Sequence, residues 1–307
     1  LWGLPFNSED RILISDSEHP GVMAACKELA KRLNLFIDIF PIQYINKDFK
    51  NQESCKLLLD SFEKKLKKKT RLVVVSHILW NTGQIIPIEE ISKRIKNHPN
   101  KPFLLVDGAQ SFSHIPIEKV ASVSDIFAFT GHKWALGPEG LGGAALSERI
   151  LEESTPTLIG WKSLKNEHIN TLDKENVFHN DSRRFEVGTS CIPLMAGLRS
   201  SLDHFEEEGS IEERLKKIQK LSHNFWEKIS HLNNIDAILT MPPPAGIVSF
   251  KITKSINYTK IVKKLANRNI FLRSIHYPES LRACFHIPSL DEEIDILINS
   301  LKEIMEI

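Results

Sequence analysis

Short apolar runs alternate with longer amphipathic segments over roughly the first half of the chain. The longer segments at Pro20–Arg32, Glu53–Lys69 and Pro87–Asn97 have helical spacing. The short runs predict β-strands at Arg11–Asp16, Leu35–Ile42, Arg71–His77, Phe103–Asp107, Asp125–Thr130 and Gly142–Leu146. Strands that alternate with helices in this way predict an α/β fold with a mainly parallel sheet covered by helices.

The remaining sequence predicts two long helices followed by a smaller α+β unit. The helices, Pro193–Glu208 and Ser210–Ser230, are separated at Gly209, a plausible C-cap. The α+β unit is predicted to contain strands Gly246–Ile252, Phe271–Ile275 and Leu281–Ile287 and helices Tyr258–Arg268 and Leu290–Ile304. We therefore expect a large α/β domain at residues 1–209 and a small C-terminal domain at 210–307.

Composition excludes several kinds of partner. The 307 residues have a formal net charge of +1, so neither nucleic acid nor an anionic membrane is expected to bind. The lysine-rich run 64–69 is typical of the solvated end of a helix. The sequence has no apolar stretch near the ~20 residues of a membrane span and no signal-peptide pattern at its start. The four cysteines form no C-x-x-C pair, which favours a reducing compartment, so we expect a cytoplasmic protein.

Five polar residues lie at or just after the carboxyl ends of two predicted strands. They are Asp107, Gln110, Thr130, His132 and Lys133. Ligands of open α/β sheets bind at this edge, so these residues are expected to form one site. A lysine that can form a Schiff base and an aspartate that can pair with a pyridinium nitrogen are what pyridoxal 5'-phosphate (PLP) requires of a protein. The pattern therefore predicts a PLP enzyme.

Three motifs resemble those of class V, fold-type I PLP enzymes, which implies a mainly parallel sheet of the seven-stranded type. They are Val106-Asp107-Gly108-Ala109-Gln110, Thr130-Gly131-His132-Lys133 and Arg184-Phe185-Glu186-Val187-Gly188-Thr189. The family includes aminotransferase-like proteins, cysteine desulfurases and kynureninases. The runs 76–84, 158–161 and 271–273, with Leu281-Arg282-Ala283-Cys284, are similar to the branch of cyanobacterial L-cysteine/cystine C-S lyases.

The resemblance implies a role for each cofactor-binding residue. Lys133 would carry the cofactor covalently, and Asp107 would keep the pyridine nitrogen protonated so that the ring accepts electrons. Gln110 would hydrogen-bond the phenolic oxygen, and His19 would stack on the ring. Phosphate contacts would come from Thr130, His132 and, across a homodimer interface, Thr189 of the other subunit. Without the resemblance, the favoured interpretations would be a turn residue for Asp107 and a helix-entry residue for His19.

Two arginines and a tryptophan are implied in substrate binding. Arg282 would bind the α-carboxylate through its planar guanidinium and Arg273 would assist, which suits a substrate with two carboxylates such as cystine. Trp161 matches a pocket residue of the lyase branch, although core packing is an equally good explanation. Relatives often carry an asparagine where this chain has Trp80, so the role of Asn81 stays open.

The type of reaction is predicted from the absence of a nucleophilic cysteine. Cysteine desulfurases carry a cysteine shortly before the carboxylate-binding arginine, but this chain has none between Arg273 and Arg282. Cys284 is expected to face a neighbouring strand. The resemblance therefore predicts β-elimination from cysteine or cystine, giving pyruvate, ammonia and sulfide or persulfide. The alternatives are another class V activity, such as aminotransferase, epimerase or desulfurase-like chemistry, and a non-catalytic binding protein.

Fold-type I enzymes normally carry a phosphate-binding strand, turn and helix ahead of the region matched here. We therefore expect the sequence to be a fragment that lacks this N-terminal segment.

Overall fold

A computed structural model describes residues 1–42, 52–165, 177–253 and 257–305. Its larger sheet has six strands in the order β2-β1-β3-β4-β5-β6. The first five strands in this order are parallel, and β6 is antiparallel to β5. The strands are β1 (Arg11–Ser15), β2 (Phe36–Phe40), β3 (Thr70–Ser76), β4 (Phe103–Asp107), β5 (Ile126–Thr130) and β6 (Gly142–Leu146). The α/β prediction with a mainly parallel sheet is confirmed, although the described residues form six strands of it and not the seven that the resemblance implies.

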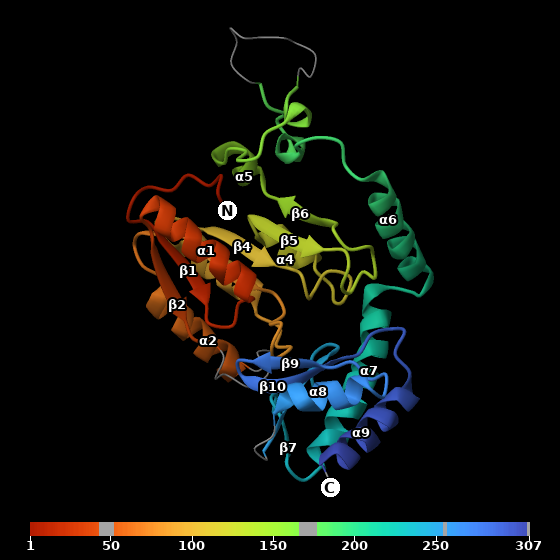
Figure 1. The fold of residues 1–307 in the computed structure, drawn as a ribbon. Coiled ribbons are helices and arrows are strands. Elements are labelled where there is room, and N and C mark those ends of the chain that lie inside the picture. The colour runs from red at the N-terminus through yellow and green to blue at the C-terminus, as the bar shows by residue number, and fades with distance from the viewer. Residues whose placement is uncertain (43–51, 166–176, 254–256, 306–307) are drawn as a thin grey trace.

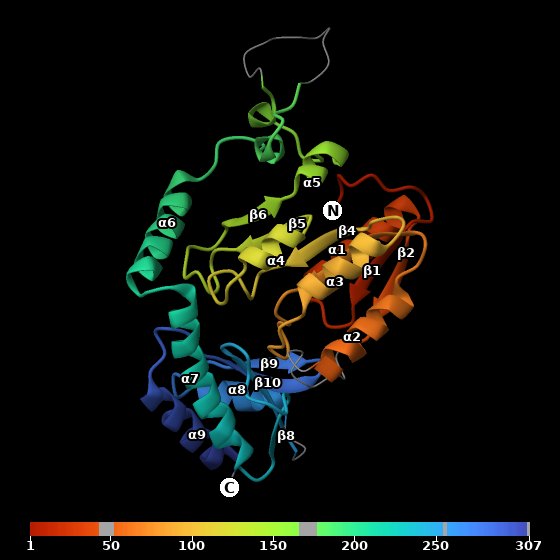
Figure 2. The same cartoon turned by 180° about the vertical axis from the view of Figure 1, so that it is seen from behind.

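Helices cover both faces of this sheet (Figures 1 and 2). One face packs on α1 (Pro20–Leu33) through a cluster that includes Leu29, and α5 (Glu148–Glu153) adds Ile150 to it. The other face packs on α2 (Gln52–Lys65), α3 (Ile88–Asn97) and α4 (Glu118–Val123). With both faces buried, the middle strands are apolar along most of their length, which leaves the carboxyl ends as the place for polar side chains.

A smaller four-stranded sheet, in the order β7-β8-β10-β9, lies beyond the carboxyl edge of the large one (Figure 1). Its strands are antiparallel: β7 (Ile235–Ala237), β8 (Ile247–Ile252), β9 (Arg273–His276) and β10 (Glu279–Cys284). The helices packed on it are α7 (Ile211–Ser230), α8 (Tyr258–Ala266) and α9 (Asp291–Met305). The turn between α6 (Ile192–Glu207) and α7 contains Gly209 at φ +106°, where the sequence predicted a helix end.

Some predicted boundaries are wrong. The helix predicted to reach Lys69 ends at Lys65, because Thr70 closes a turn by accepting the Lys67 N–H at 2.9 Å. The strand predicted to reach Ile287 ends at Cys284. The short elements α4, α5 and β7 were not predicted, since runs this short carry little periodicity. None of the helices in the described ranges combines the length and apolar composition needed to span a bilayer.

Candidate active site

Neighbouring parallel strands bring Asp107 and Lys133 to the same edge of the large sheet. Asp107 ends β4 opposite Ser76 of β3 and Ala128 of β5, and Lys133 follows the end of β5. An inner cavity of about 90 Å³ lies at this edge. It is lined by His19, Ser76, Ile78, Trp80, Asp107, Ala109, Gln110 and Lys133. Four of the predicted cofactor-binding residues, His19, Asp107, Gln110 and Lys133, are thus brought together.

The surroundings of Lys133 lower the pKa of its amine. Burial lowers the pKa of Lys133, and the nearby charges of Arg282 and Arg273 lower it further. The Asp107 carboxylate acts in the opposite direction. A lysine whose ammonium form is disfavoured offers its lone pair as a nucleophile or base, which is what Schiff-base formation requires.

His19 serves both as a helix cap and as a wall of the cavity. It precedes α1, and its Nδ1 accepts the Gly21 N–H at 3.2 Å, so a neutral His19 carries its proton on Nε2. Burial, followed by the charge of Lys133, lowers the pKa of His19. The ring meets Trp80 edge-on, with centroids 5.4 Å apart. The structural and the cofactor-binding interpretations of His19 are therefore compatible.

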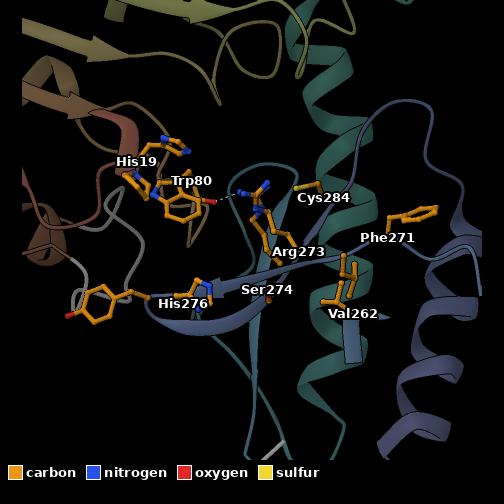
Figure 3. Close-up of a pocket in the computed structure, with 12 residues that line it drawn as sticks. His19, Trp80, Val262, Phe271, Arg273, Ser274, His276 and Cys284 are labelled. Atoms are coloured by element: carbon orange, nitrogen blue, oxygen red, sulfur yellow. Dashed lines mark hydrogen bonds between the residues drawn. The ribbon is translucent and has the colours of Figure 1, made fainter. Parts of the chain in front are cut away.

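An outer cavity of about 780 Å³ adjoins the inner one and shares His19 and Trp80 with it (Figure 3). Arg273 and Arg282 line it from directly opposite positions on β9 and β10. Arg282 donates to the Trp80 carbonyl at 2.5 Å, while its buried Nε has no hydrogen-bond partner among the described residues. Over the same ranges, neither guanidinium lies within ion-pair distance of a carboxylate. Opposed like charges destabilise a sheet, so an anionic ligand would stabilise this pair.

The prediction for Cys284 is wrong. Its side chain is exposed and lines the outer cavity (Figure 3), which Arg282 also lines. The reason is the alternation of β10, in which Leu281 and Ala283 are buried in the small core while Arg282 and Cys284 share the other face. Although the residue as a whole is exposed, the protein groups around its thiol desolvate it and raise the pKa of Cys284, and Arg282 and Lys133 oppose this effect.

Four predicted site residues do not line either cavity. Thr130 and His132 hydrogen-bond each other at 2.5 Å at the end of β5. Trp161 begins the short helix η1 (Trp161–Ser163) and is 47% exposed. Thr189 is also exposed. The roles assigned to these residues stay predictions.

Two neighbours of Asp107 were not predicted as site residues. Trp80 joins the two cavities, and Glu18 is buried beside the strand ends. Glu18 accepts hydrogen bonds from the Ser15 hydroxyl at 2.5 Å, the Ser76 hydroxyl at 2.5 Å and the Ser76 N–H at 3.0 Å. A usable signal was present for both, since each follows an apolar strand at the edge where Asp107 lies.

The buried Glu18 should make stability depend on pH. Burial raises the pKa of Glu18 from 4.5 to about 7, with the charge of Asp107 adding to this shift. Between these values the folded protein keeps a proton that the unfolded chain releases, so stability falls as pH rises, by about 3 kcal/mol for this group. In Glu18→Gln this fall should disappear from urea unfolding curves measured between pH 4.5 and 7.5. The matched variant Glu28→Gln, on the exposed side of α1, should keep it, and an unchanged profile in Glu18→Gln would contradict the assignment.

Comparison with known proteins identifies the family. Residues 2–297 match the aminotransferase class V family model, so the chain belongs to this family, whose members are PLP-dependent enzymes. The predicted fold-type I class is thereby confirmed.

Sequence identity to individual relatives and solved structures is modest. The chain is 25% identical to a probable cysteine desulfurase of Mycolicibacterium paratuberculosis, covering 99% of the chain and 44% of that protein. It is 26% identical to a probable cysteine desulfurase of Halalkalibacterium halodurans, covering 97% of the chain and 71% of that protein. Among solved structures it resembles the cystine C-S lyase C-DES in complex with its reaction product cysteine persulfide, at 36% identity and a TM-score of 0.89, over 98% of this chain and 77% of that one. Apo cysteine desulfurase from Thermococcus onnurineus NA1 is 26% identical with a TM-score of 0.84, over 99% of this chain and 75% of that one.

Proposed function

We propose that the protein is a PLP-dependent C-S lyase that performs β-elimination on cysteine or cystine. The observation that carries this proposal is the opposed pair Arg273 and Arg282, which lines a cavity adjoining the one that holds Lys133. An α-amino acid needs an anchor for its carboxylate within reach of the reacting lysine. The likeness to C-DES, which is described as a cystine C-S lyase, supports this choice of substrate.

The side chains that line the inner cavity suit PLP. Lys133 would bind the cofactor covalently, Asp107 would pair with the pyridine nitrogen, Gln110 would donate to the phenolic oxygen and His19 would cover the ring. Bound PLP supplies an electron sink that stabilises negative charge on the substrate Cα. The carboxylate of Asp107 also accepts the Ala109 N–H at 2.8 Å, which holds it in place at the cavity wall.

The chain's own residues would supply the remaining steps. Arg282 and Arg273 bind the substrate carboxylates, and two guanidiniums match the two carboxylates of cystine. The amine of Lys133, whose pKa is lowered by burial, would accept the Cα proton, and the Cβ–S bond would then break with its electron pair leaving on sulfur. With one water, cystine yields pyruvate, ammonia and cysteine persulfide; cysteine yields pyruvate, ammonia and sulfide.

Cys284 makes a desulfurase the second candidate. A thiolate facing the substrate could attack the sulfur of cysteine, taking it as an enzyme persulfide and leaving alanine. The raised pKa of Cys284 argues against this reaction, because a protonated thiol is a weak nucleophile near neutral pH.

Product analysis separates the two candidates. The full-length gene product, loaded with PLP, is expected to convert cystine to pyruvate with little alanine, and Cys284→Ala should keep at least about half of this activity, since the thiol takes no part in elimination. Cys26→Ala, at a buried cysteine of α1, is a matched control for loss of a thiol. Alanine as the main product, lost in Cys284→Ala alone, would identify a desulfurase; a product other than pyruvate or alanine would point to another class V activity.

We also propose that the enzyme is a homodimer in which Thr189 reaches the partner's phosphate site. Thr189 is exposed and lines neither cavity of its own chain, and the nearby Val187, Ile192 and Met195 are exposed apolar residues. Sedimentation of the purified protein as a monomer would contradict this proposal.

A further inference from the structure

Three aromatic rings stack beside the cofactor cavity, and they lie in segments that follow strands of both sheets. His114 lies on the buried Trp134 ring with centroids 3.4 Å apart and planes 9° from parallel. His286, just after β10 of the small sheet, lies 5.2 Å from Trp134, at 17°. Trp134 is the direct neighbour of Lys133, so the stack holds the segment that carries the reacting amine.

The hydrogen bonds of the stack have only one possible direction. The Gly246 N–H donates to His114 Nε2 at 2.8 Å, so His114 Nδ1 carries the proton that is donated to the Gln110 carbonyl at 2.8 Å. Burial lowers the pKa of His114 to about 3, which keeps the ring neutral. His286 accepts the Ile287 N–H through Nδ1 and donates from Nε2 to the Trp134 carbonyl at 2.8 Å.

Trp134 also determines the orientation of Gln110. The indole N–H can only donate, and it lies 2.8 Å from Oε1 of Gln110. With that oxygen engaged, the amide nitrogen is the end of Gln110 that remains for the inner cavity, which Gln110 lines. The side chain is thereby presented as a donor and prevented from turning its oxygen to the cavity.

The small domain holds this arrangement in place. A Cβ at Gly246 would lie 2.9 Å from the Trp134 ring and 2.2 Å from the Phe285 carbonyl, so only glycine lets the loop before β8 approach this closely. Gly246 and His286 thus contact the stack from the same small sheet that carries Arg282. The orientation of the Gln110 amide therefore depends on contact between the segments of the small sheet and the segment that carries Trp134.

We propose that Trp134 is a positioning residue that holds the Gln110 amide with its nitrogen directed at the cofactor's phenolic oxygen. The inference rests on the proposed function, because it needs PLP bound at Lys133. With PLP bound, a donor at that oxygen would compete with the Schiff-base proton for the oxygen's lone pairs, so the Gln110 amide would lower the pKa of the Schiff base. Trp134 would therefore act on the cofactor through its hydrogen bond to Gln110, without contacting the cofactor itself.

The test is a spectroscopic pH titration of the PLP-loaded protein. In Trp134→Phe, which keeps a stacked ring but removes the donor, the midpoint of the visible-band titration should rise by about one pH unit, the scale of one hydrogen bond. Trp226→Phe removes an indole N–H bonded to the Leu239 carbonyl of the small domain and should leave the midpoint unchanged. The other charged and titratable groups that act on Lys133, namely Asp107, His19, Arg273, Arg282 and Cys284, are common to all these proteins.

A double-mutant cycle tests whether Trp134 acts through Gln110. Gln110→Met should raise the midpoint by a similar amount, and adding Trp134→Phe to it should cause no further shift. If the midpoint shifted by the full amount a second time in the double variant, or did not shift in Trp134→Phe, the proposal that Trp134 positions Gln110 would be overturned.

A measurement on the protein without PLP keeps the proposal testable if these variants fail to bind the cofactor. Hydrogen exchange at the Trp134 indole should be slow in the wild-type apoprotein and about tenfold faster in Gln110→Met, which removes the acceptor. Equal exchange rates in the wild-type apoprotein and in Gln110→Met would overturn the proposal that Trp134 holds Gln110, whether or not the cofactor binds. If the wild-type protein forms no visible band with PLP, the proposed function fails instead, and the exchange experiment still decides whether Trp134 holds Gln110.

Discussion

Replacing Lys133 by alanine is expected to abolish the covalent attachment of PLP and to reduce turnover of cystine at least about a thousandfold. The variant loses both the amine that binds the cofactor and the base that accepts the Cα proton, and general base catalysis alone contributes about 10²–10⁴ in rate. The measurement is pyruvate release from cystine, together with the borohydride-sensitive visible absorbance of the loaded protein.

The matched control for this variant is Lys119→Ala, at an exposed position on α4. It should keep both the absorbance and the activity. If Lys133→Ala retained more than a tenth of the wild-type rate, Lys133 would not be the reacting lysine.

Replacing Arg282 by leucine is expected to lower kcat/KM for cystine at least about 30-fold. Removing one partner of a hydrogen-bonded charge pair costs about 2–5 kcal/mol, and Arg282 faces the cavity with no carboxylate of its own among the described residues. Arg282→Lys should lose less, because it keeps the charge but not the planar fork. Steady-state kinetics with cystine measures both variants.

Arg268→Leu is the control for loss of a guanidinium near the small sheet. Arg268 pairs at the surface with Glu303 and is expected to leave kcat/KM unchanged. An Arg282→Leu enzyme with wild-type kcat/KM would mean that the carboxylate binds elsewhere.

The central part of the site was predictable from the sequence because it depends on local order. Asp107 and Lys133 each follow an apolar strand, and neighbouring parallel strands place their carboxyl ends side by side. The prediction needed only the strand pattern and the chemistry of a lysine and an aspartate. The burial that lowers the pKa of Lys133 follows from the same position.

The orientation of Cys284 could have been predicted but was not. Placing Arg282 in the substrate site also places Cys284 there, since residues two apart on a strand share a face. The place of Trp80 near Asp107 could be predicted because it follows β3, but its position between two cavities could not, because that depends on how the small sheet meets the large one. The same holds for the stack of His114, Trp134 and His286, whose members come from distant parts of the chain.

The central claim is that Lys133 is the residue that binds PLP in this enzyme. The most direct measurement is borohydride reduction of the PLP-loaded full-length protein, followed by peptide mass mapping of the stable adduct. The account predicts a single pyridoxyl modification, on Lys133, that cystine added before reduction diminishes. A pyridoxyl group on another lysine, or a protein that borohydride leaves unmodified, would contradict it.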